Sequence, residues 1–376
     1  MTGIPTRIFR YKDFCVLPNI LAGKMSMSWE YYKRITLVIH VDYSYLDDTI
    51  LYQVNTWDGP VSLAIVLSAI NLKEAFFATK EKVLRYAATT KEKLSVHLIY
   101  RWPVGCEKTN LEPDVPLPSV ALYPANVARN VARMLSRSKY LLIADYAHIF
   151  SINFESQMLK LAEDVLERDP KTVLVFRIFE ANANASSVPR DRRTLYESYK
   201  KGEAIVFHGR YNPGAHTIPN LDGWFKRNIT YDQPALSFTL PYNRISWEPQ
   251  FVSLTTIPFH DEHFPYTIRD NTVLRWEMCR LEYKFVLVEN VFMVHPGIKT
   301  PLDRNRRLRR IAAPIFQSAV ALFEKRMDKC CRETKKRCPR ITLIPSSRFL
   351  SKRSPHKQSS VSLAVHRRNG KMLLRN

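Results

Sequence analysis

Apolar runs and helix-periodic segments alternate along the first half of the chain. Continuous apolar runs of strand length lie at 35–40, 61–67, 94–100 and 140–144. Between them, apolar residues recur at helical spacing at 45–55, 73–88 and 126–137. Strand–helix alternation with short connections is typical of an α/β fold. We therefore expect a mixed, mostly parallel sheet flanked by helices.

The second half of the chain has a less regular pattern. A helix at 156–168 and a strand at 172–176 still continue the alternation. Beyond these, Pro, Asn and aromatic residues interrupt the periodicity, so this half is expected to be rich in loops. Regular segments return as two short strands and a final helix, at 285–288, 291–294 and 314–327.

The composition indicates a packed protein without a glycine-rich phosphate loop. Hydrophobic residues make up 45% of the 376 residues, and there are only 10 Gly. Neither a P-loop nor a G-x-G-x-x-G motif occurs. Phosphate groups, where bound, must therefore be held by a metal ion, by basic side chains or by helix N-termini.

Positive charge is concentrated at the end of the chain. The net charge is +22, and residues 326–376 contain 15 Lys or Arg against 2 Asp or Glu. We expect this segment to be a disordered, solvated tail. No recognised nucleic-acid motif accompanies the charge, so nucleic acid is not an expected partner. A cytosolic polyanion-binding role for the tail is a remote alternative.

The first 34 residues are expected to form an N-terminal segment outside the main domain. They contain no uninterrupted apolar stretch of signal or membrane length. The protein is then either cytosolic, if the chain is complete, or a type II membrane protein of the Golgi or secretory lumen whose anchor lies upstream. Membrane association is expected only through such a missing segment. Glycosylation triplets at Asn184 and Asn228 favour the lumen.

Asp145 directly follows the apolar run 140–144. In open α/β sheets, ligands bind beyond the carboxyl ends of the strands, which is where this carboxylate is expected. The alternative is that Asp145 caps a nearby helix.

Six segments in order resemble glycosyltransferase family 49, which includes LARGE-type enzymes and the beta-1,4-glucuronyltransferase. The resemblance covers residues 35–325, which we expect to form one GT-A-like domain with a loop-rich acceptor half. The motifs that carry it are Trp57-Asp58-Gly59-Pro60, Tyr123-Pro124-Ala125-Asn126 with Arg129-Asn130, His216 with Asn220 and Trp224, Trp247-Glu248-Pro249, Asp261-Glu262 with Phe264, and His295-Pro296-Gly297-Ile298-Lys299.

The resemblance implies transfer of a sugar, expected to be glucuronic acid, from a UDP donor to a glycan on a glycoprotein with inversion. In the family an Asp-x-Asp pair and a late His hold Mn²⁺ or Mg²⁺, which matches Asp145 and His295. The second Asp position is Ala147, which cannot bind a metal. Arg129, Asn130 and Lys299 match residues near the donor.

Inverting transfer also needs a general base to deprotonate the acceptor hydroxyl. Asp261 and Glu262 are the first candidates and Glu248 is the next, although the Asp261–Glu262 pair could instead be an exposed acidic turn. The family's glycine after this motif is replaced by Ile268, which is expected to reshape the acceptor site. The alternative function is a catalytically impaired relative, with an incomplete Asp-x-Asp, that binds a glycan or a partner protein.

Overall fold

The structure, a computed structural model, describes residues 7–68, 71–90, 92–101, 106, 122–227, 235–303 and 305–341. The glycosylation triplet at Asn228 and tail residues 342–376 lie outside these ranges. All elements described here belong to one unit that ends at Pro339. Within the described ranges, no helix has both the length and the apolar character needed to span a membrane.

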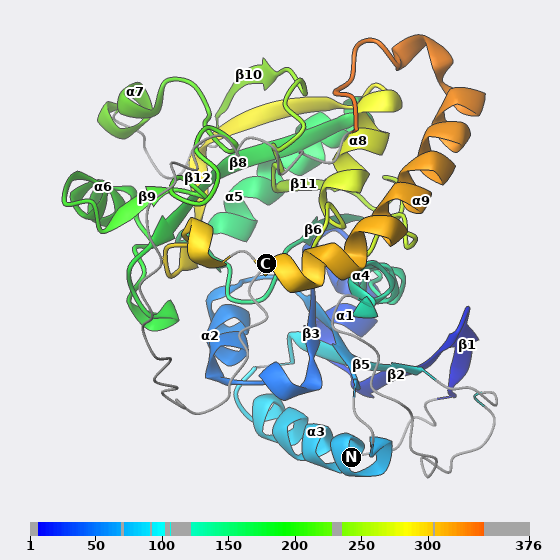
Figure 1. Ribbon diagram of the computed structural model, residues 1–376. Coiled ribbons are helices and arrows are strands. Elements are labelled where there is room, and N and C mark those ends of the chain that lie inside the picture. The colour runs from blue at the N-terminus through cyan, green and yellow to red at the C-terminus, as the bar shows by residue number, and fades with distance from the viewer. Residues whose placement is uncertain are drawn as a thin grey trace, which may run out of the picture. The chain divides into compact units, whose positions relative to one another are not determined.

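One mixed sheet forms the centre of this unit (Figure 1). Its strands follow the spatial order β1-β2-β5-β4-β3-β6-β11-β8-β12-β10, with β7 paired to β12 and β9 to β8. The strands are β1 (Phe9–Tyr11), β2 (Phe14–Leu21), β3 (Ile35–Asp42), β4 (Val61–Val66), β5 (Leu94–Arg101), β6 (Tyr140–Ile143), β7 (Ile149–Phe150), β8 (Thr172–Ala181), β9 (Ala204–Val206), β10 (Leu236–Leu240), β11 (Phe251–Leu254) and β12 (Lys284–Pro296).

The predicted mixed α/β sheet is confirmed, with its parallel pairs in two blocks. β5, β4, β3 and β6 are parallel neighbours, and β8 is parallel to β12. β11 runs antiparallel between the two blocks, and β2 and β10 are antiparallel on the outer sides. All eight residues of β3 are buried, as expected for a parallel strand covered on both faces.

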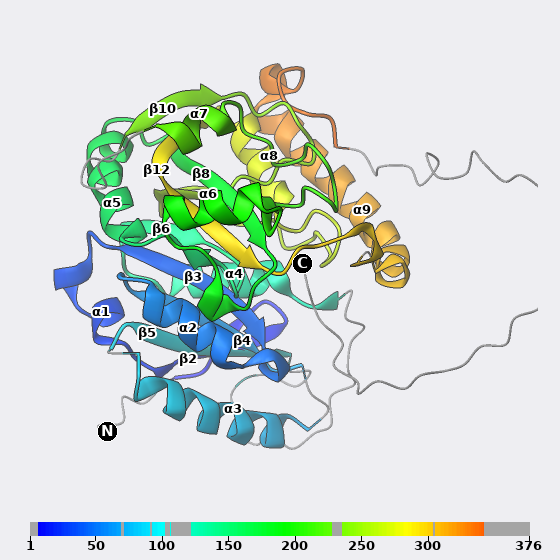
Figure 2. The ribbon, with the colours of Figure 1, turned by 90° about the vertical axis from the view of Figure 1, so that its left-hand side faces the viewer.

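Helices cover both faces of the sheet (Figures 1 and 2). Apolar residues of α2, α3 and α5 share one core with alternate residues of β3 and β4, whereas α4 packs on the opposite face of these strands. The helices are α1 (Lys24–Met27), α2 (Asp48–Thr56), α3 (Leu72–Ala87), α4 (Ala125–Met134), α5 (Phe154–Leu161), α6 (Arg192–Lys200), α7 (Leu221–Lys226), α8 (Thr272–Arg280) and α9 (Arg306–Cys330).

The loop-rich half contains a second apolar core. It joins α6 and α7 to β8 and β12, and Trp224 is fully buried in it with its indole N–H donating to Glu289 O. Trp57 is buried in the first core. The two short strands expected at 285–288 and 291–294 are one strand, β12, with an irregularity in its pairing to β8 between Leu287 and Phe292.

The N-terminal segment belongs to the sheet rather than lying outside it. β2 pairs with β5, and a disulfide joins Cys15 to Cys106. The strand was missed because Pro18 and Asn19 interrupt it, and Asn19 has a positive φ of 53°. The sheet therefore extends beyond the boundary expected at residue 34.

The basic tail was expected to begin at residue 326, but this residue lies within α9. α9 continues to Cys330 because Phe316, Phe323 and Met327 bury one face of the helix. A disulfide between Cys279 and Cys338 then ties the following turn to α8. Residues 326–341 are thus part of the described fold, and the expected disorder concerns residues outside the described ranges.

Candidate active site

Asp145 lies two residues beyond β6, at the carboxyl ends of the parallel strands β3 and β6. Arg129 of α4 donates from Nη2 to Asp145 Oδ1 at 3.2 Å and from Nη1 to Asp270 Oδ2 at 2.8 Å. The Arg129 side chain is 1% exposed, so it is a buried cation between two carboxylates. Asp145 does not cap the next helix, because the N-cap residue of α5 is Asn153.

The Arg129 guanidinium decides the charge state of Asp145. Burial raises the pKa of this carboxyl, but the positive charge of Arg129 outweighs burial and holds the pKa well below its usual range. Burial raises the pKa of Asp270, and Arg129 only partly offsets that effect. Arg129 therefore holds Asp145 in the ionised form.

The backbone after Asp145 is held in a fixed turn. Gln53 of α2 donates from Nε2 to Asp145 O at 3.1 Å and to His148 O at 2.9 Å. Ala147, in the position of the second family carboxylate, has a left-handed φ of 70°. A residue with a Cβ is strained in this conformation, and Asp and Asn tolerate it better than Ala does.

These side chains do not fit a divalent-metal centre built by the protein alone. No group of three His, Cys, Asp or Glu that could hold a metal ion occurs within the described ranges. Asp145 is paired to Arg129, and Ala147 offers only a methyl group. Magnesium and manganese prefer several oxygen ligands.

Four histidines gather around the buried ring of Phe207, close to Asp145. The rings of His148 and His295 have centroids 5.7 Å apart. Those of His208 and His216 are 5.2 Å apart, and each lies within 5.0 Å of the Phe207 ring. We call this set the histidine cluster: His148, His208, His216 and His295.

The histidines of the cluster are held in the neutral form. Burial is the largest cause, and it lowers the pKa of His148 and His216 to about 4. It also holds the pKa of His208 and His295 well below the usual range. The positive charge of Lys299 lowers the pKa of all four rings as well. Lys299 is only 5% exposed, so its ammonium group belongs to this interior.

Two asparagines of α4 hold the segment that contains Asp261 and Glu262. Asn130 Nδ2 donates to His260 O at 2.9 Å and to Glu262 Oε1 at 2.7 Å, and its Oδ1 accepts from His260 N at 3.0 Å. Asn126 Nδ2 donates to Asp261 O at 2.8 Å and Asp270 O at 2.9 Å. The polar atoms of Asn130 are engaged within the protein, which favours a positioning role.

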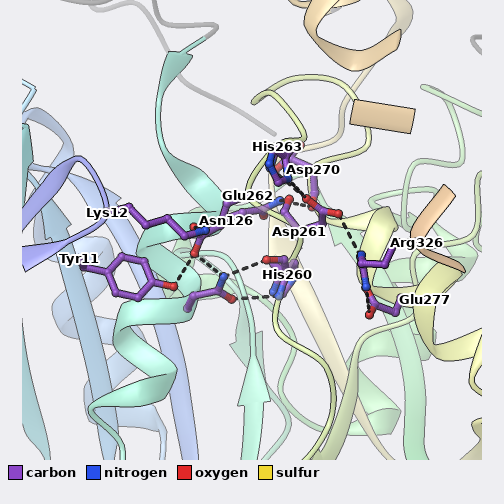
Figure 3. A network of polar contacts seen from close by, with 11 residues as sticks. Tyr11, Lys12, Asn126, His260, Asp261, Glu262, His263, Asp270, Glu277 and Arg326 are labelled. Carbon is purple, nitrogen blue, oxygen red and sulfur yellow. Dashed lines mark hydrogen bonds and ion pairs between the residues drawn. The ribbon is translucent and has the colours of Figure 1, made fainter. Parts of the chain in front are cut away.

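Asp261 and Glu262 are both tied to cations (Figure 3). Glu262 accepts from Lys12 Nζ at 2.5 Å and from the Tyr11 hydroxyl at 2.7 Å, so the β1–β2 hairpin meets the segment from one side. Asp261 accepts from Arg326 of α9 at 3.0 Å on the other side. Each carboxylate side chain is only 7% exposed, so the pair is not an exposed acidic turn.

Glu248 has a different environment from the Asp261–Glu262 pair. It accepts a hydrogen bond from the Thr272 hydroxyl and forms no ion pair in the described part of the chain. Its negative charge acts to raise the pKa of His216, of Asp270 and of the buried Arg275. Asp145 acts in the same way on His148 and His295, so both carboxylates act electrostatically on the histidine cluster.

Several residues of the site carry no sequence signal that singles them out. His208 follows β9 in an irregular region. Gln53 lies on α2, whose sequence pattern indicates only a helix packed against the sheet. Tyr11 and Lys12 come from the hairpin that sequence reasoning left outside the domain. His216 and His295, in contrast, lie in motifs that the sequence shows, His216 by its spacing to Asn220 and Trp224 and His295 in the segment 295–299.

Curated relatives of known name match most of this region. The chain is 27% identical over 207 residues to a beta-1,4-glucuronyltransferase 1 of Danio rerio, covering 53% of this chain and 47% of the relative. It is 22% identical over 243 residues to the human xylosyl- and glucuronyltransferase LARGE1, covering 64% and 28%. A LARGE-like protein of Caenorhabditis elegans is 23% identical, covering 75% and 40%. The chain thus spans less than half the length of these relatives.

Solved structures show more distant likenesses. GalNAc-T7 with UDP, GalNAc and Mn²⁺ has a TM-score of 0.43 at 12% identity, covering 81% of this chain and 51% of that chain. Residues 1–349 of S. aureus TarS have a TM-score of 0.38 at 12% identity, covering 80% and 73%.

The family model described as "Glycosyl-transferase for dystroglycan" matches residues 34–330, which include every element from β3 to α9. The match contains Arg129, Asp145, Glu248, His295 and Lys299 in one stretch. The GT-A-like α/β sheet expected from the resemblance agrees with the observed strand order. The chain therefore belongs to this glycosyltransferase family, whose members include the LARGE-type enzymes and beta-1,4-glucuronyltransferase 1.

Proposed function

We propose that this protein transfers glucuronic acid from a UDP donor to a glycan acceptor with inversion. The observation that carries the proposal is the ionised Asp145, which Arg129 holds at the carboxyl ends of the parallel strands β3 and β6 in a chain of this glycosyltransferase family. Inverting transfer needs a donor group on one side of the sugar and a base on the other. The names of the relatives support glucuronic acid as the sugar.

Glu248 is the general base in this proposal. A general base must accept the proton of the acceptor hydroxyl. A carboxylate paired with a cation is a weaker proton acceptor. Asp261 and Glu262 form ion pairs with Arg326 and Lys12, whereas Glu248 accepts from a hydroxyl and acts on the buried Arg275 without a direct ion pair among the described residues. In this proposal, Asp261 and Glu262 hold the segment around them in place through their ion pairs with Arg326 and Lys12.

The donor side of the proposal uses Asp145 and Lys299. Lys299 supplies positive charge for an anionic donor, and Arg129 keeps Asp145 ionised and in position. A divalent ion at Asp145 and His295 would need oxygens of the donor diphosphate to complete its ligands. The proposal therefore assigns no step to Mn²⁺, and a metal requirement is left to the assay.

We also place the protein in the secretory lumen, with the Golgi as the expected compartment. Two disulfides link distant parts of the described chain, Cys15–Cys106 and Cys279–Cys338. Such bonds form and persist in oxidising compartments and are rare in the cytosol. Reduction under native conditions followed by thermal unfolding tests whether these bonds stabilise the fold.

The direct test is UDP release from a panel of UDP-sugars, with and without a xylose-terminated acceptor. The proposal expects acceptor-dependent release from UDP-glucuronic acid, with the anomeric configuration of the product inverted by NMR. Arms with Mn²⁺, Mg²⁺ and EDTA measure the metal requirement. Release from no donor, together with no UDP binding by calorimetry, would falsify the proposal.

A catalytically impaired relative is the second candidate. Ala147 and the Arg129–Asp145 pair favour it, because they leave the donor site without a second carboxylate. This candidate expects glycan or partner binding without turnover. A glycan array probed with the full chain, alongside the UDP-release assay, separates the two functions.

A further inference from the structure

The start of α8 joins the Arg129–Asp145 pair to Glu248 through direct contacts. Asp270 lies just before the helix, and Thr272 is its first residue. Asp270 accepts from Arg129 Nη1 at 2.8 Å, and Arg129 also donates to Asp145. Two residues further on, the Thr272 hydroxyl donates to Glu248 Oε1. One short segment therefore contacts both the partner of Asp145 and the side chain of Glu248.

The backbone beside Glu248 is fixed by its neighbours. Pro249 restricts the residue before it to extended conformations. Arg275 of α8 donates from Nε to Pro249 O at 3.1 Å and from Nη1 to Asn271 O at 2.9 Å. Since Arg275 is only 1% exposed, it joins the Glu248–Pro249 segment to the start of α8 inside the protein.

The two carboxylate oxygens of Glu248 have different surroundings. Oε1 accepts from Thr272, which is completely buried, and the β-branched side chain of threonine has few rotamers. Glu248 itself is partly exposed, and it makes no other hydrogen bond or ion pair within the described ranges. The protein thus anchors one oxygen and leaves the other for a hydroxyl group of a ligand.

Orientation decides whether such a carboxylate can accept a proton. A general base must lie within hydrogen-bond distance of the proton that it removes, and a small misplacement lowers the rate. A partly exposed glutamate has several staggered rotamers unless a neighbour holds it. Among the described side chains, the Thr272 hydroxyl is the one that donates a hydrogen bond to Glu248.

We propose that Thr272 is the positioning residue of Glu248, holding Oε1 so that Oε2 is directed toward the acceptor hydroxyl. This inference rests on the proposed function and deepens it. In the transfer, the proton of the acceptor hydroxyl passes to Glu248 Oε2 while the acceptor oxygen bonds to the anomeric carbon. The bond between that carbon and the diphosphate oxygen breaks, and its electron pair leaves with UDP.

The first test measures turnover of UDP-glucuronic acid with a xylose-terminated acceptor. Thr272→Val removes the hydroxyl and should lower kcat by about 10–100-fold, the worth of one hydrogen bond to a charged group. Thr272→Ser keeps a hydroxyl and should stay within about threefold of wild type. KM for the UDP donor should change by less than about threefold in both variants, because the contact belongs to the acceptor side.

The control Thr36→Val removes another buried hydroxyl, which donates to Ser138 Oγ at 2.6 Å. Thr36 lies near the start of β3, at the end of the strand opposite Asp145. This variant should keep kcat within about threefold of wild type, whatever its effect on stability. A loss of kcat as large as that in Thr272→Val would overturn the inference, because removal of any buried hydroxyl would then suffice.

A double-mutant cycle separates positioning from a structural role of Thr272. Because Thr272 acts through Glu248, Thr272→Val should cause no further loss of kcat in a Glu248→Gln background. Wild-type kcat in Thr272→Val, or the same fold loss with and without Glu248, overturns the inference alone. Wild-type kcat in Glu248→Gln sinks the proposed base and the inference together.

Acceptor binding gives a readout that does not need turnover. A xylose-terminated oligosaccharide, titrated by calorimetry in the presence of UDP, should bind Thr272→Ser as it binds wild type and Thr272→Val about tenfold more weakly. If this pattern appears in a protein that turns over no donor, the proposed transfer fails and the orientation of Glu248 toward a glycan hydroxyl is upheld. No binding, or equal affinity of wild type and Thr272→Val, in such a protein overturns the inference as well.

Discussion

Two sets of carboxylates in this protein have the same chemistry and different surroundings. Asp261 and Glu262 are each bound to a cation, from α9 and from the β1–β2 hairpin. Glu248 accepts from the Thr272 hydroxyl, and its charge acts on His216 and on the buried Arg275. The difference teaches that an acidic motif which resembles a catalytic pair can hold the structure together, and it is the reason why we propose the single carboxylate of Glu248 as the base.

The largest effect on stability is expected at Arg129, which compensates both Asp145 and Asp270 in the interior. Arg129→Met leaves two buried carboxylates without a cation and should lower the free energy of unfolding by about 3–5 kcal/mol. Denaturant unfolding measures it. The control Arg137→Met removes an exposed arginine from the same region and should cost less than about 1 kcal/mol. Similar losses for both variants would contradict the buried-pair account.

A substitution at position 147 tests whether Asp145 belongs to a donor site. Ala147→Asp restores a carboxylate two residues from Asp145 and suits the left-handed backbone. Mn²⁺ affinity in the presence of UDP should rise by about tenfold or more, since added ligand charge strengthens binding of hard cations. Ala147→Asn shares the backbone preference without the charge and is the matched control. If Asn and Asp give the same Mn²⁺ affinity by calorimetry, Asp145 does not belong to a donor site.

Asp261 predicts a pH dependence of stability. Burial alone raises its pKa, but hydrogen bonds from His263 and Arg326 outweigh burial and hold the pKa below its usual range. A lowered pKa in the folded state stabilises the protein above the unfolded value of about 4, and that stabilisation is lost as the pH falls through the folded value. Asp261→Asn should therefore cost about 1 kcal/mol at pH 7 and less near pH 3.

Unfolding of wild type and Asp261→Asn across this pH range checks the expectation. Asp164→Asn, which removes an exposed ion pair with Arg168, serves as the surface control. A difference between wild type and Asp261→Asn that stays constant down to pH 3 would show that the Arg326 contact is not linked to ionisation of Asp261.

The smallest effect is expected at the hairpin. Lys12 is 60% exposed, so its ion pair with Glu262 is screened by solvent. Lys12→Met should lower the free energy of unfolding by less than about 1 kcal/mol. A double-mutant cycle with Glu262→Gln isolates the pair. A coupling energy near zero would mean that Tyr11 and Asn130, and not Lys12, hold Glu262.

The parallel half of the fold could be predicted from the sequence, because each buried strand there is a continuous apolar run. β3, β4, β5 and β6 lie where periodicity placed them, within one or two residues. β2 could not be predicted, since Pro18 and Asn19 interrupt it and its partner β5 is distant in sequence. Strand pairing between remote segments leaves little local signal.

Several residues of the site could be predicted from the sequence, but the side chains that contact them could not. The position of Asp145 at a strand end followed from the apolar run before it. The pairing of Asp261 with Arg326 and of Glu262 with Lys12 depends on where the two chain ends pack, which no local pattern encodes. The histidine cluster draws on the turns after β6 and β9 and on the end of β12, so only the fold assembles it.

The central claim is that Glu248 acts as base while Glu262 holds the structure, and paired Gln variants test it most directly. The measurement is kcat for UDP-glucuronic acid turnover together with the free energy of unfolding. The account predicts that Glu248→Gln lowers kcat by about 10²–10⁴-fold with little change in stability. It predicts that Glu262→Gln keeps kcat within about threefold and lowers stability by about 1–3 kcal/mol. The reverse pattern, with kcat lost in Glu262→Gln and kept in Glu248→Gln, would contradict it.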